Sequence, residues 1–242
     1  MSGWRPATVT ALRPESASAR TVVLEVPDWP GHDAGQHLDI RLTAEDGYTA
    51  TRSYSIANVP GGDLVEITVE RLDDGEVSPY LVDDVLPGDR VEVRGPVGGW
   101  FVWRPVQTEP LLLVGGGSGV VPLMAVVRRH RETSSAAPLR LVYSVRDPDA
   151  TIYRDELESL TADGLSLTYV FTRRTPAGWA RPAGRLDRQL LAEAAFAPAE
   201  RATSYVCGPT GFVETVADLL VGAGHDPRRV RTERFGPSGG NS

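Results

Sequence analysis

The stretch LLLVGGGSGVVPLMAVVRRHRE, Leu111 to Glu132, joins an apolar run to a helix-like segment through a loop rich in glycine. A continuous apolar run is typical of a strand buried inside a parallel sheet. The same alternation continues to the C-terminus, with expected strands at 139–145, 165–171 and 203–208 and expected helices at 152–160, 185–196 and 210–224. Strands that alternate with helices predict an α/β parallel-sheet fold with helices on both faces.

The residues before 104 follow a different pattern. They contain short, alternating, β-branched runs separated by turn residues: TVVLEV from Thr21, QHLDIRL from Gln36, YTATRSYSIA from Tyr48, LVEITVE from Leu64 and RVEVRG from Arg90. Strands this short and evenly spaced predict an antiparallel β-barrel or sandwich, with one short helix at 77–84. We therefore expect two domains, a β-barrel over residues 1–104 and an α/β domain over residues 105–242.

The composition excludes several classes of function. A net charge of −7 disfavours general binding to nucleic acid or to anionic membranes. We find neither an apolar run long enough to span a membrane nor a signal-peptide pattern, so we expect a cytoplasmic protein. One cysteine and four scattered histidines give no metal-ligand spacing, so we expect no metal. All 25 basic residues are arginine, so bound phosphates would meet guanidinium groups or backbone N–H groups.

The glycine-rich loop is a candidate nucleotide site. Glycines let a backbone approach a ligand closely, and the N–H groups at the start of a helix favour an anion. The loop fits the pattern G-x-G-x-G-x-x-P, which ends at Pro122. It does not fit the dinucleotide fingerprint G-x-G-x-x-G, because the last glycine of that pattern would fall on Val120. The next expected strand ends in Tyr143 to Arg146, with no acidic residue at its tip to bind a ribose. The loop therefore indicates a nucleotide site of another subtype.

Four motifs in order resemble the ferredoxin–NADP reductase superfamily of flavoprotein reductases. They are RSYS at 52–55, the loop GGGSGVVP at 115–122, YVCGPTGF at 205–212 and ERF at 233–235. The resemblance covers nearly the whole chain. It implies a barrel that binds flavin, FAD in preference to FMN, and a following α/β domain that binds a nicotinamide dinucleotide.

The resemblance implies roles for residues of the barrel half. Arg52 would pair with the flavin phosphates, Tyr54 would pack on the isoalloxazine ring, and Ser55 would hydrogen-bond near the nitrogen that accepts hydride. Strand alternation puts Arg52 and Tyr54 on one face and Ser55 on the other, so the flavin would lie along the edge or end of the strand. A second flavin motif, expected to meet the pyrophosphate, consists of Gly75, Glu76, Val77 and Ser78.

In the α/β half, the resemblance assigns the dinucleotide pyrophosphate to Gly115, Gly116, Gly117, Ser118 and Gly119. The nicotinamide ring would lie near Cys207, Gly208 and Pro209. Glu233 would act beside the reacting rings with Ser55 and Cys207, and Phe235 would cover the flavin face. The pair Thr172 and Arg173 stands where the family binds the phosphate of NADPH, with Arg174 directly after it and Arg181 and Arg185 further along the chain. We therefore expect NADPH to be favoured slightly over NADH.

These features predict an NAD(P)H-dependent FAD oxidoreductase that passes electrons to a separate one-electron acceptor protein. A ferredoxin, a flavodoxin, an oxygenase component or a haem component would be such an acceptor. One alternative is a free-flavin or ferric reductase of the same fold. Another is a non-catalytic nucleotide-sensing or assembly module, because a fold does not fix a function.

Overall fold

The computed structural model describes residues 3–236 and divides the chain into two compact units. The first unit comprises Met1–Pro105 and Met124–Thr133, and the second comprises Val106–Leu123 and Ser134–Ser242. Most of the C-terminal tail GPSGGNS, residues 237–242, lies outside the described residues.

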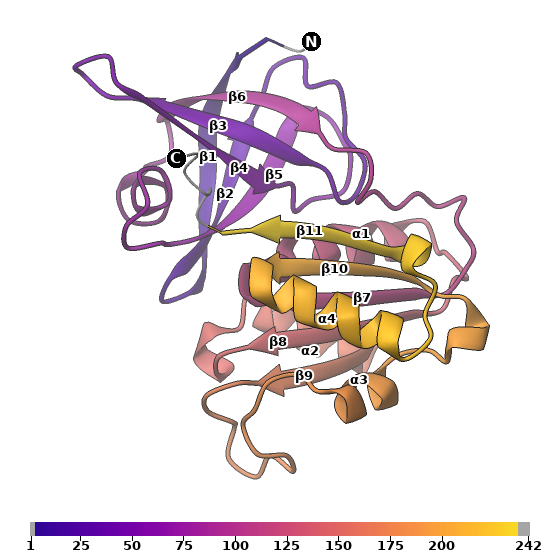
Figure 1. The fold of residues 1–242 in the computed structure, drawn as a ribbon. Coiled ribbons are helices and arrows are strands. Elements are labelled where there is room, and N and C mark those ends of the chain that lie inside the picture. The colour runs from indigo at the N-terminus through magenta and orange to yellow at the C-terminus, as the bar shows by residue number, and fades with distance from the viewer. Residues whose placement is uncertain (1–2, 237–242) are drawn as a thin grey trace, which may run out of the picture. The chain divides into compact units, whose positions relative to one another are not determined.

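The first unit is built on a six-stranded antiparallel sheet (Figure 1). Its strands are β1 (Arg5–Ser16), β2 (Ala19–Glu25), β3 (His37–Thr43), β4 (Thr49–Ser55), β5 (Leu64–Glu70) and β6 (Arg90–Val97). They are hydrogen-bonded in the order β4-β3-β6-β1-β2-β5. An isolated bridge between Ile56 and Ile67 joins the end of β4 to β5, so the two edge strands meet there and the sheet curls into a barrel.

The barrel core follows from alternation along the strands. Leu38 and Ile40 of β3 are fully buried and lie opposite Tyr54 and Arg52 of β4. Burying each such aliphatic side chain contributes about 1.5–3 kcal/mol. The turn η1 (Tyr80–Asp84) adds Leu81 to the same core. The predicted helix at 77–84 is therefore confirmed from Ser78 onward, and its residues Tyr80–Asp84 are π-helical.

Strand β1 has no counterpart among the predicted strands. It contains Pro6 and Pro14, and each removes a backbone donor, so its sequence does not look like a strand. It forms because β2 and β6 both pair with it, and the register shifts between Pro14 and Ser16. Tertiary pairing overrides the local pattern here.

The second unit is a five-stranded parallel sheet in the order β11-β10-β7-β8-β9. Its strands are β7 (Leu111–Gly116), β8 (Leu139–Val145), β9 (Ser166–Phe171), β10 (Thr203–Pro209) and β11 (Val230–Phe235). Its helices are α2 (Arg154–Ala162), α3 (Arg188–Ala194) and α4 (Thr210–Gly222), and α1 (Val120–Glu132) begins in it. The predicted α/β parallel sheet is confirmed, and the strand expected at 139–145 matches β8 residue for residue.

Helices α3 and α4 cover one face of this sheet (Figure 1). Leu190 of α3 and Val213 of α4 pack in one cluster with Leu112, Val142 and Val206 of the sheet. Strand β11 was not predicted, because its sequence VRTERF carries three charged residues. It forms as an edge strand through parallel pairing with β10. None of the helices found within residues 3–236 is long and apolar enough to cross a membrane.

Candidate functional site

The RSYS motif lies on an edge strand of the barrel. Strand β4 pairs with β3 along its length, and its other edge meets β5 only at the Ile56–Ile67 bridge. Tyr54 packs against the barrel core, and burial raises the pKa of its phenol, so the ring stays neutral. Arg52 projects from the same face, but its side chain is 44% exposed. The hydroxyl of Ser55 points to the other face, because Ser55 directly follows Tyr54 and neighbouring residues of a strand point to opposite faces.

Arg52 is bound by two oxygens of the protein. Its Nη1 donates to the carbonyl oxygen of Thr51 at 2.7 Å, and its Nη2 donates to Oε2 of Glu76. The other oxygen of that carboxylate, Oε1, accepts a hydrogen bond from the hydroxyl of Tyr48. The hydrogen bonds from Tyr48 and Arg52 lower the pKa of Glu76, and the Glu76 carboxylate raises the pKa of Tyr48. The carboxylate is therefore charged at neutral pH.

The second flavin motif, residues 75–78, forms a tight loop in which Gly75, Val77 and Ser78 maintain the loop structure. Ser78 is buried, and its Oγ accepts a hydrogen bond from the backbone N–H of Leu72 at 3.1 Å. A Cβ on Gly75 would lie 2.6 Å from that Oγ, so the turn requires glycine. Val77 is fully buried. Glu76, 43% exposed, is thus the side chain that this loop presents to solvent.

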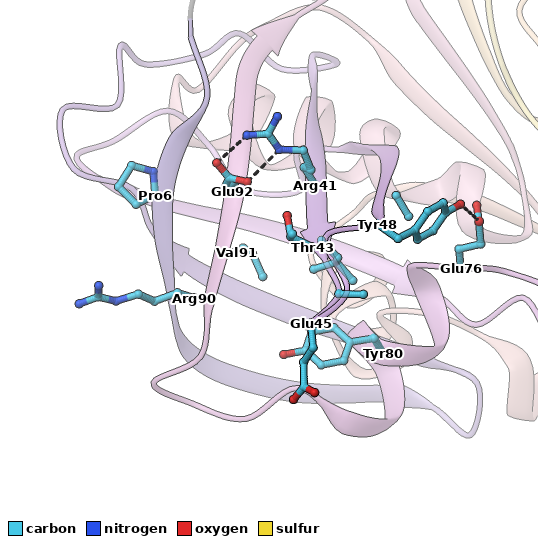
Figure 2. A pocket seen from close by; sticks show the side chains of 13 residues that line it. Pro6, Arg41, Thr43, Glu45, Tyr48, Glu76, Tyr80, Arg90, Val91 and Glu92 are labelled. Atoms are coloured by element: carbon cyan, nitrogen blue, oxygen red, sulfur yellow. Dashed lines mark hydrogen bonds and ion pairs between the residues drawn. The ribbon is translucent and has the colours of Figure 1, made fainter.

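Tyr48 and Glu76 also line a pocket of about 830 Å³ in the first unit. Figure 2 shows the two side chains pointing toward one another, and Tyr80 of η1 lines the same pocket. Leu42, Ala50 and Val91 contribute to the apolar part of the lining, and an Arg41–Glu92 ion pair lies among the remaining residues. Sequence reasoning had assigned no function to Tyr48, which lies four residues before Arg52.

In the second unit, the glycine loop meets the end of β10. The loop contains the single 3-10 turn η2 (Gly117–Gly119), with Ser118 half-buried in it and Gly117 at a φ of +56°. A Cβ on Gly119 would lie 2.2 Å from the carbonyl oxygen of Cys207 and 2.8 Å from the N of Gly208. The structure therefore brings together two motifs whose residues Gly119 and Cys207 lie 88 positions apart in the chain.

The place where they meet is a topological switch point. Strands β7 and β10 are neighbours, and the chain continues from β7 to β8 on one side and from β10 to β11 on the other. Open α/β sheets bind ligands beyond the carboxyl ends of the strands at such a point. A side chain on Gly116 would also clash, because its Cβ would lie 2.7 Å from the ring of Phe212. The bare backbone at these glycines fits a dinucleotide that lies close against it.

Cys207 lies inside this site rather than at its surface. Its side chain is 1% exposed, and burial raises the pKa of the thiol well above its usual range, with a further contribution from the charge of Glu233. Cys207 and Glu233 are register partners across β10 and β11. A buried, protonated thiol can pack against a ring, but it is no nucleophile at neutral pH. Phe235 pairs with Pro209 at the end of β11 and is 37% exposed.

The predicted coenzyme-phosphate residues follow β9. The backbone N–H of Thr172 donates to Val145 and that of Arg173 donates to Arg146, so the segments after β8 and β9 run together. Arg174 forms ion pairs with Asp147 and Asp149, and Arg181 pairs with Glu193. The side chain of Arg173 is exposed and forms no ion pair within residues 3–236.

Two acidic residues in this region were missed by sequence reasoning. The predicted strand tip ends at Arg146, and Asp147 and Asp149 lie one and three residues beyond it. Asp147 accepts backbone hydrogen bonds from Asp149 and Ala150 at the start of the turn η3 (Pro148–Ala150). The carboxylates of Asp147 and Asp149 both pair with Arg174, whereas neither pairs with Arg173.

Comparison with known proteins identifies both units. Residues 6–102 match the oxidoreductase FAD-binding domain family, and residues 113–218 match the oxidoreductase NAD-binding domain family. The chain is 31% identical over 240 residues to the ferredoxin reductase component of a 3-ketosteroid-9-alpha-monooxygenase from Rhodococcus rhodochrous. It is 33% identical over 208 residues to a glycine betaine monooxygenase reductase subunit from Pseudomonas aeruginosa.

These matches cover 97% and 84% of this chain but only 66% and 56% of the two relatives. Among solved structures, the FAD/NAD-binding domain of a nitric oxide dioxygenase from Vibrio cholerae matches with a TM-score of 0.86 at 27% identity. That match covers 98% of this chain and 100% of the other. The chain belongs to the ferredoxin–NADP reductase superfamily of FAD- and NAD(P)-binding oxidoreductases.

Proposed function

We propose that this protein takes hydride from NAD(P)H onto FAD and delivers the electrons to a separate one-electron acceptor protein. The observation that carries the proposal is the close approach of Gly119 to the backbone of Cys207 and Gly208 at the switch point of the sheet. That contact leaves bare backbone for a dinucleotide beside a buried thiol. The edge strand β4, which carries the exposed Arg52 within the RSYS motif, supports the flavin-binding part of the proposal.

In the first unit, the residues of β4 have separate tasks. Arg52 would bind the flavin phosphates, because a guanidinium makes charge-assisted bonds to phosphate oxygens. Tyr54, held by the barrel core, would give the ring system a fixed surface. The hydroxyl of Ser55 would hydrogen-bond at the edge of the ring system where hydride arrives. When bound, the flavin supplies the conversion between two-electron and one-electron transfer.

In the second unit, backbone groups and packing do most of the work. The N–H groups of the glycine loop and of the start of α1 would bind the dinucleotide pyrophosphate. Cys207, as a neutral thiol, would pack against the nicotinamide and help to set its orientation. Glu233, its register partner on β11, would lie beside the same ring and act on its position.

We further infer that NADPH is somewhat preferred over NADH. Thr172 and Arg173 would bind the additional phosphate of NADPH, and Arg173 is the one of the two arginines at 173–174 without an ion pair in the described part of the chain. Asp147 and Asp149 oppose this preference, but Arg174 offsets their charge.

The acceptor is proposed from the relatives. Two of them are described as a reductase component and a reductase subunit of monooxygenases, which supports an oxygenase or its ferredoxin as the acceptor of this chain. The alternative of a free-flavin reductase differs in one measurable respect, because such an enzyme releases its reduced flavin.

The test is anaerobic reduction of the FAD-loaded protein, followed by gel filtration. We expect NADPH or NADH to bleach the visible flavin absorbance and the flavin to elute with the protein. A protein that binds no FAD, or whose bound FAD neither coenzyme reduces, would contradict the proposal. Flavin that elutes separately after reduction would favour the free-flavin reductase instead.

A further inference from the structure

The arginine proposed to bind the flavin phosphates is already bound by a carboxylate. Nη2 of Arg52 donates to Oε2 of Glu76, and the side chains are 44% and 43% exposed, so both lie within reach of a ligand. Glu76 belongs to the loop that the sequence assigns to the flavin pyrophosphate. The same short region thus presents one cation and one anion where a dianionic diphosphate is expected.

The chain segment that carries Glu76 adds no positive charge to the pair. The segment from Leu72 to Asp89 contains no basic residue and six acidic ones, namely Asp73, Asp74, Glu76, Asp83, Asp84 and Asp89. Arg71, just before it, forms ion pairs with Asp73 and Asp83. A phosphate that approaches Arg52 therefore meets a guanidinium whose charge Glu76 offsets, and the segment that carries Glu76 is itself acidic.

Tyr48 gives the carboxylate a second partner. The hydroxyl of Tyr48 donates to Oε1, while Arg52 donates to Oε2, so either bond can persist without the other. Tyr48 and Glu76 line the same pocket. Glu76 can therefore lose its bond to Arg52 and remain hydrogen-bonded to Tyr48. The remaining bond lowers the free-energy cost of separating Glu76 from Arg52.

We propose that Glu76 competes with the flavin phosphates for Arg52 and thereby sets the affinity of this protein for phosphate-bearing flavins. Binding of FAD exchanges the Arg52–Glu76 ion pair for an Arg52–phosphate pair, with Glu76 retained by Tyr48. The inference rests on the proposed function, because it takes Arg52 as the phosphate ligand. Under this proposal Glu76 determines specificity among flavins, whereas the sequence motif at 75–78 assigns it only to binding of the flavin pyrophosphate.

The experiment compares three flavins on the apoprotein: FAD, FMN and riboflavin, which has no phosphate. The variant Glu76→Gln keeps the shape of the side chain and one acceptor oxygen for Tyr48 but removes the charge and the second acceptor oxygen. We expect it to tighten FAD and FMN by roughly tenfold, the lower end of the range for one charge-assisted bond, and to leave riboflavin unchanged. The matched control is Glu45→Gln, which removes a carboxylate from the lining of the same pocket that forms no ion pair with Arg52.

Five outcomes bear on the inference. Unchanged or weaker FAD binding in Glu76→Gln overturns the inference, as does an equal gain for riboflavin, which would mean a change in pocket shape. The same gain in Glu45→Gln would reduce the effect to general surface charge and also overturn it. In an Arg52→Ala background, Glu76→Gln should have no effect. If wild-type protein binds no flavin at all, the proposed function itself fails, whereas FAD binding that ignores Glu76 removes this inference alone.

Discussion

The two candidate nucleotide sites of this protein are formed by different chemical groups. In the second unit the site is backbone, because Gly116 and Gly119 leave no room for a Cβ and the nearby thiol of Cys207 is buried. In the first unit the site is made of charged and aromatic side chains, with Arg52, Glu76 and Tyr48 joined in one network. A backbone site is fixed by close packing, whereas a side-chain site can be adjusted by a change of one charge. The two sites should therefore respond differently to substitution.

The largest expected effect comes from filling the backbone site. In Gly119→Ala, the new Cβ would lie 2.2 Å from the carbonyl oxygen of Cys207, so the loop must move. Misplacement on the scale of 1 Å can cost about 10²-fold in rate, and the overpacking should destabilise the fold by about 1–3 kcal/mol. We expect FAD reduction by NADPH to slow by that factor, measured by stopped flow on folded protein. The control is Gly211→Ala, since no atom lies within 4 Å of its Cβ. Normal reduction in Gly119→Ala would show that the close contact is not needed.

Removal of the cation tests the side-chain site. Arg52→Ala deletes the proposed phosphate ligand, and loss of a charge-assisted bond of ~1.5–3 kcal/mol corresponds to roughly 10- to 150-fold in affinity. We expect the dissociation constant for FAD to rise within that range in a fluorescence titration. Arg13→Ala, which removes an exposed arginine paired with Glu66 on the same unit, should bind FAD normally. Equal loss in both variants would argue against a specific phosphate contact.

A side-chain contribution to the second site is tested at the coenzyme phosphate. Arg173→Ala should raise the Michaelis constant for NADPH by up to the same roughly 10- to 150-fold and leave that for NADH nearly unchanged. We expect the lower part of this range, because Arg173 is exposed and Asp147 and Asp149 lie nearby. Arg181→Ala, whose guanidinium pairs with Glu193, serves as the control. A wild-type protein that uses NADH as well as or better than NADPH would refute the assignment of Thr172 and Arg173.

The smallest effect concerns stability and pH. His32 in the first unit accepts a hydrogen bond from Trp29 through Nδ1, and burial lowers its pKa from 6.5. Below about pH 6.5 the unfolded chain therefore takes up a proton that the folded chain resists, so the free energy of unfolding should fall as the pH falls. Burial also lowers the pKa of His225 in the second unit.

The second ring nitrogen of His32, Nε2, donates to the carbonyl oxygen of Asn58. His32→Gln can keep both hydrogen bonds of the imidazole but does not titrate. We expect denaturant unfolding between about pH 7 and about pH 5 to show a weaker pH dependence in this variant, with the His225 contribution still present. An identical pH dependence in variant and wild type would exclude His32 as a source.

The comparison also explains what could be predicted from the sequence. The predicted strand–loop–helix from Leu111 to Glu132 is confirmed, because a continuous apolar strand and a periodic helix are both local patterns. Strands β1 and β11 were missed because neighbouring strands, and not their own residues, make them strands. The Arg52–Glu76 pair was missed because its members are 24 residues apart and carry no joint pattern. The sequence motifs named both residues, but only the structure shows that one binds the other.

The central proposal is that a nicotinamide held near Cys207 passes hydride to a flavin held near Ser55, and stopped-flow flavin reduction tests it most directly. Ser55→Ala should retain FAD and be reduced more slowly, by the ~10²-fold or so expected when one positioning or charge-stabilising contact is lost. Cys207→Ala should also retain FAD and be reduced more slowly, because the ring loses a packing partner. Reduction at the wild-type rate in both variants would contradict the account.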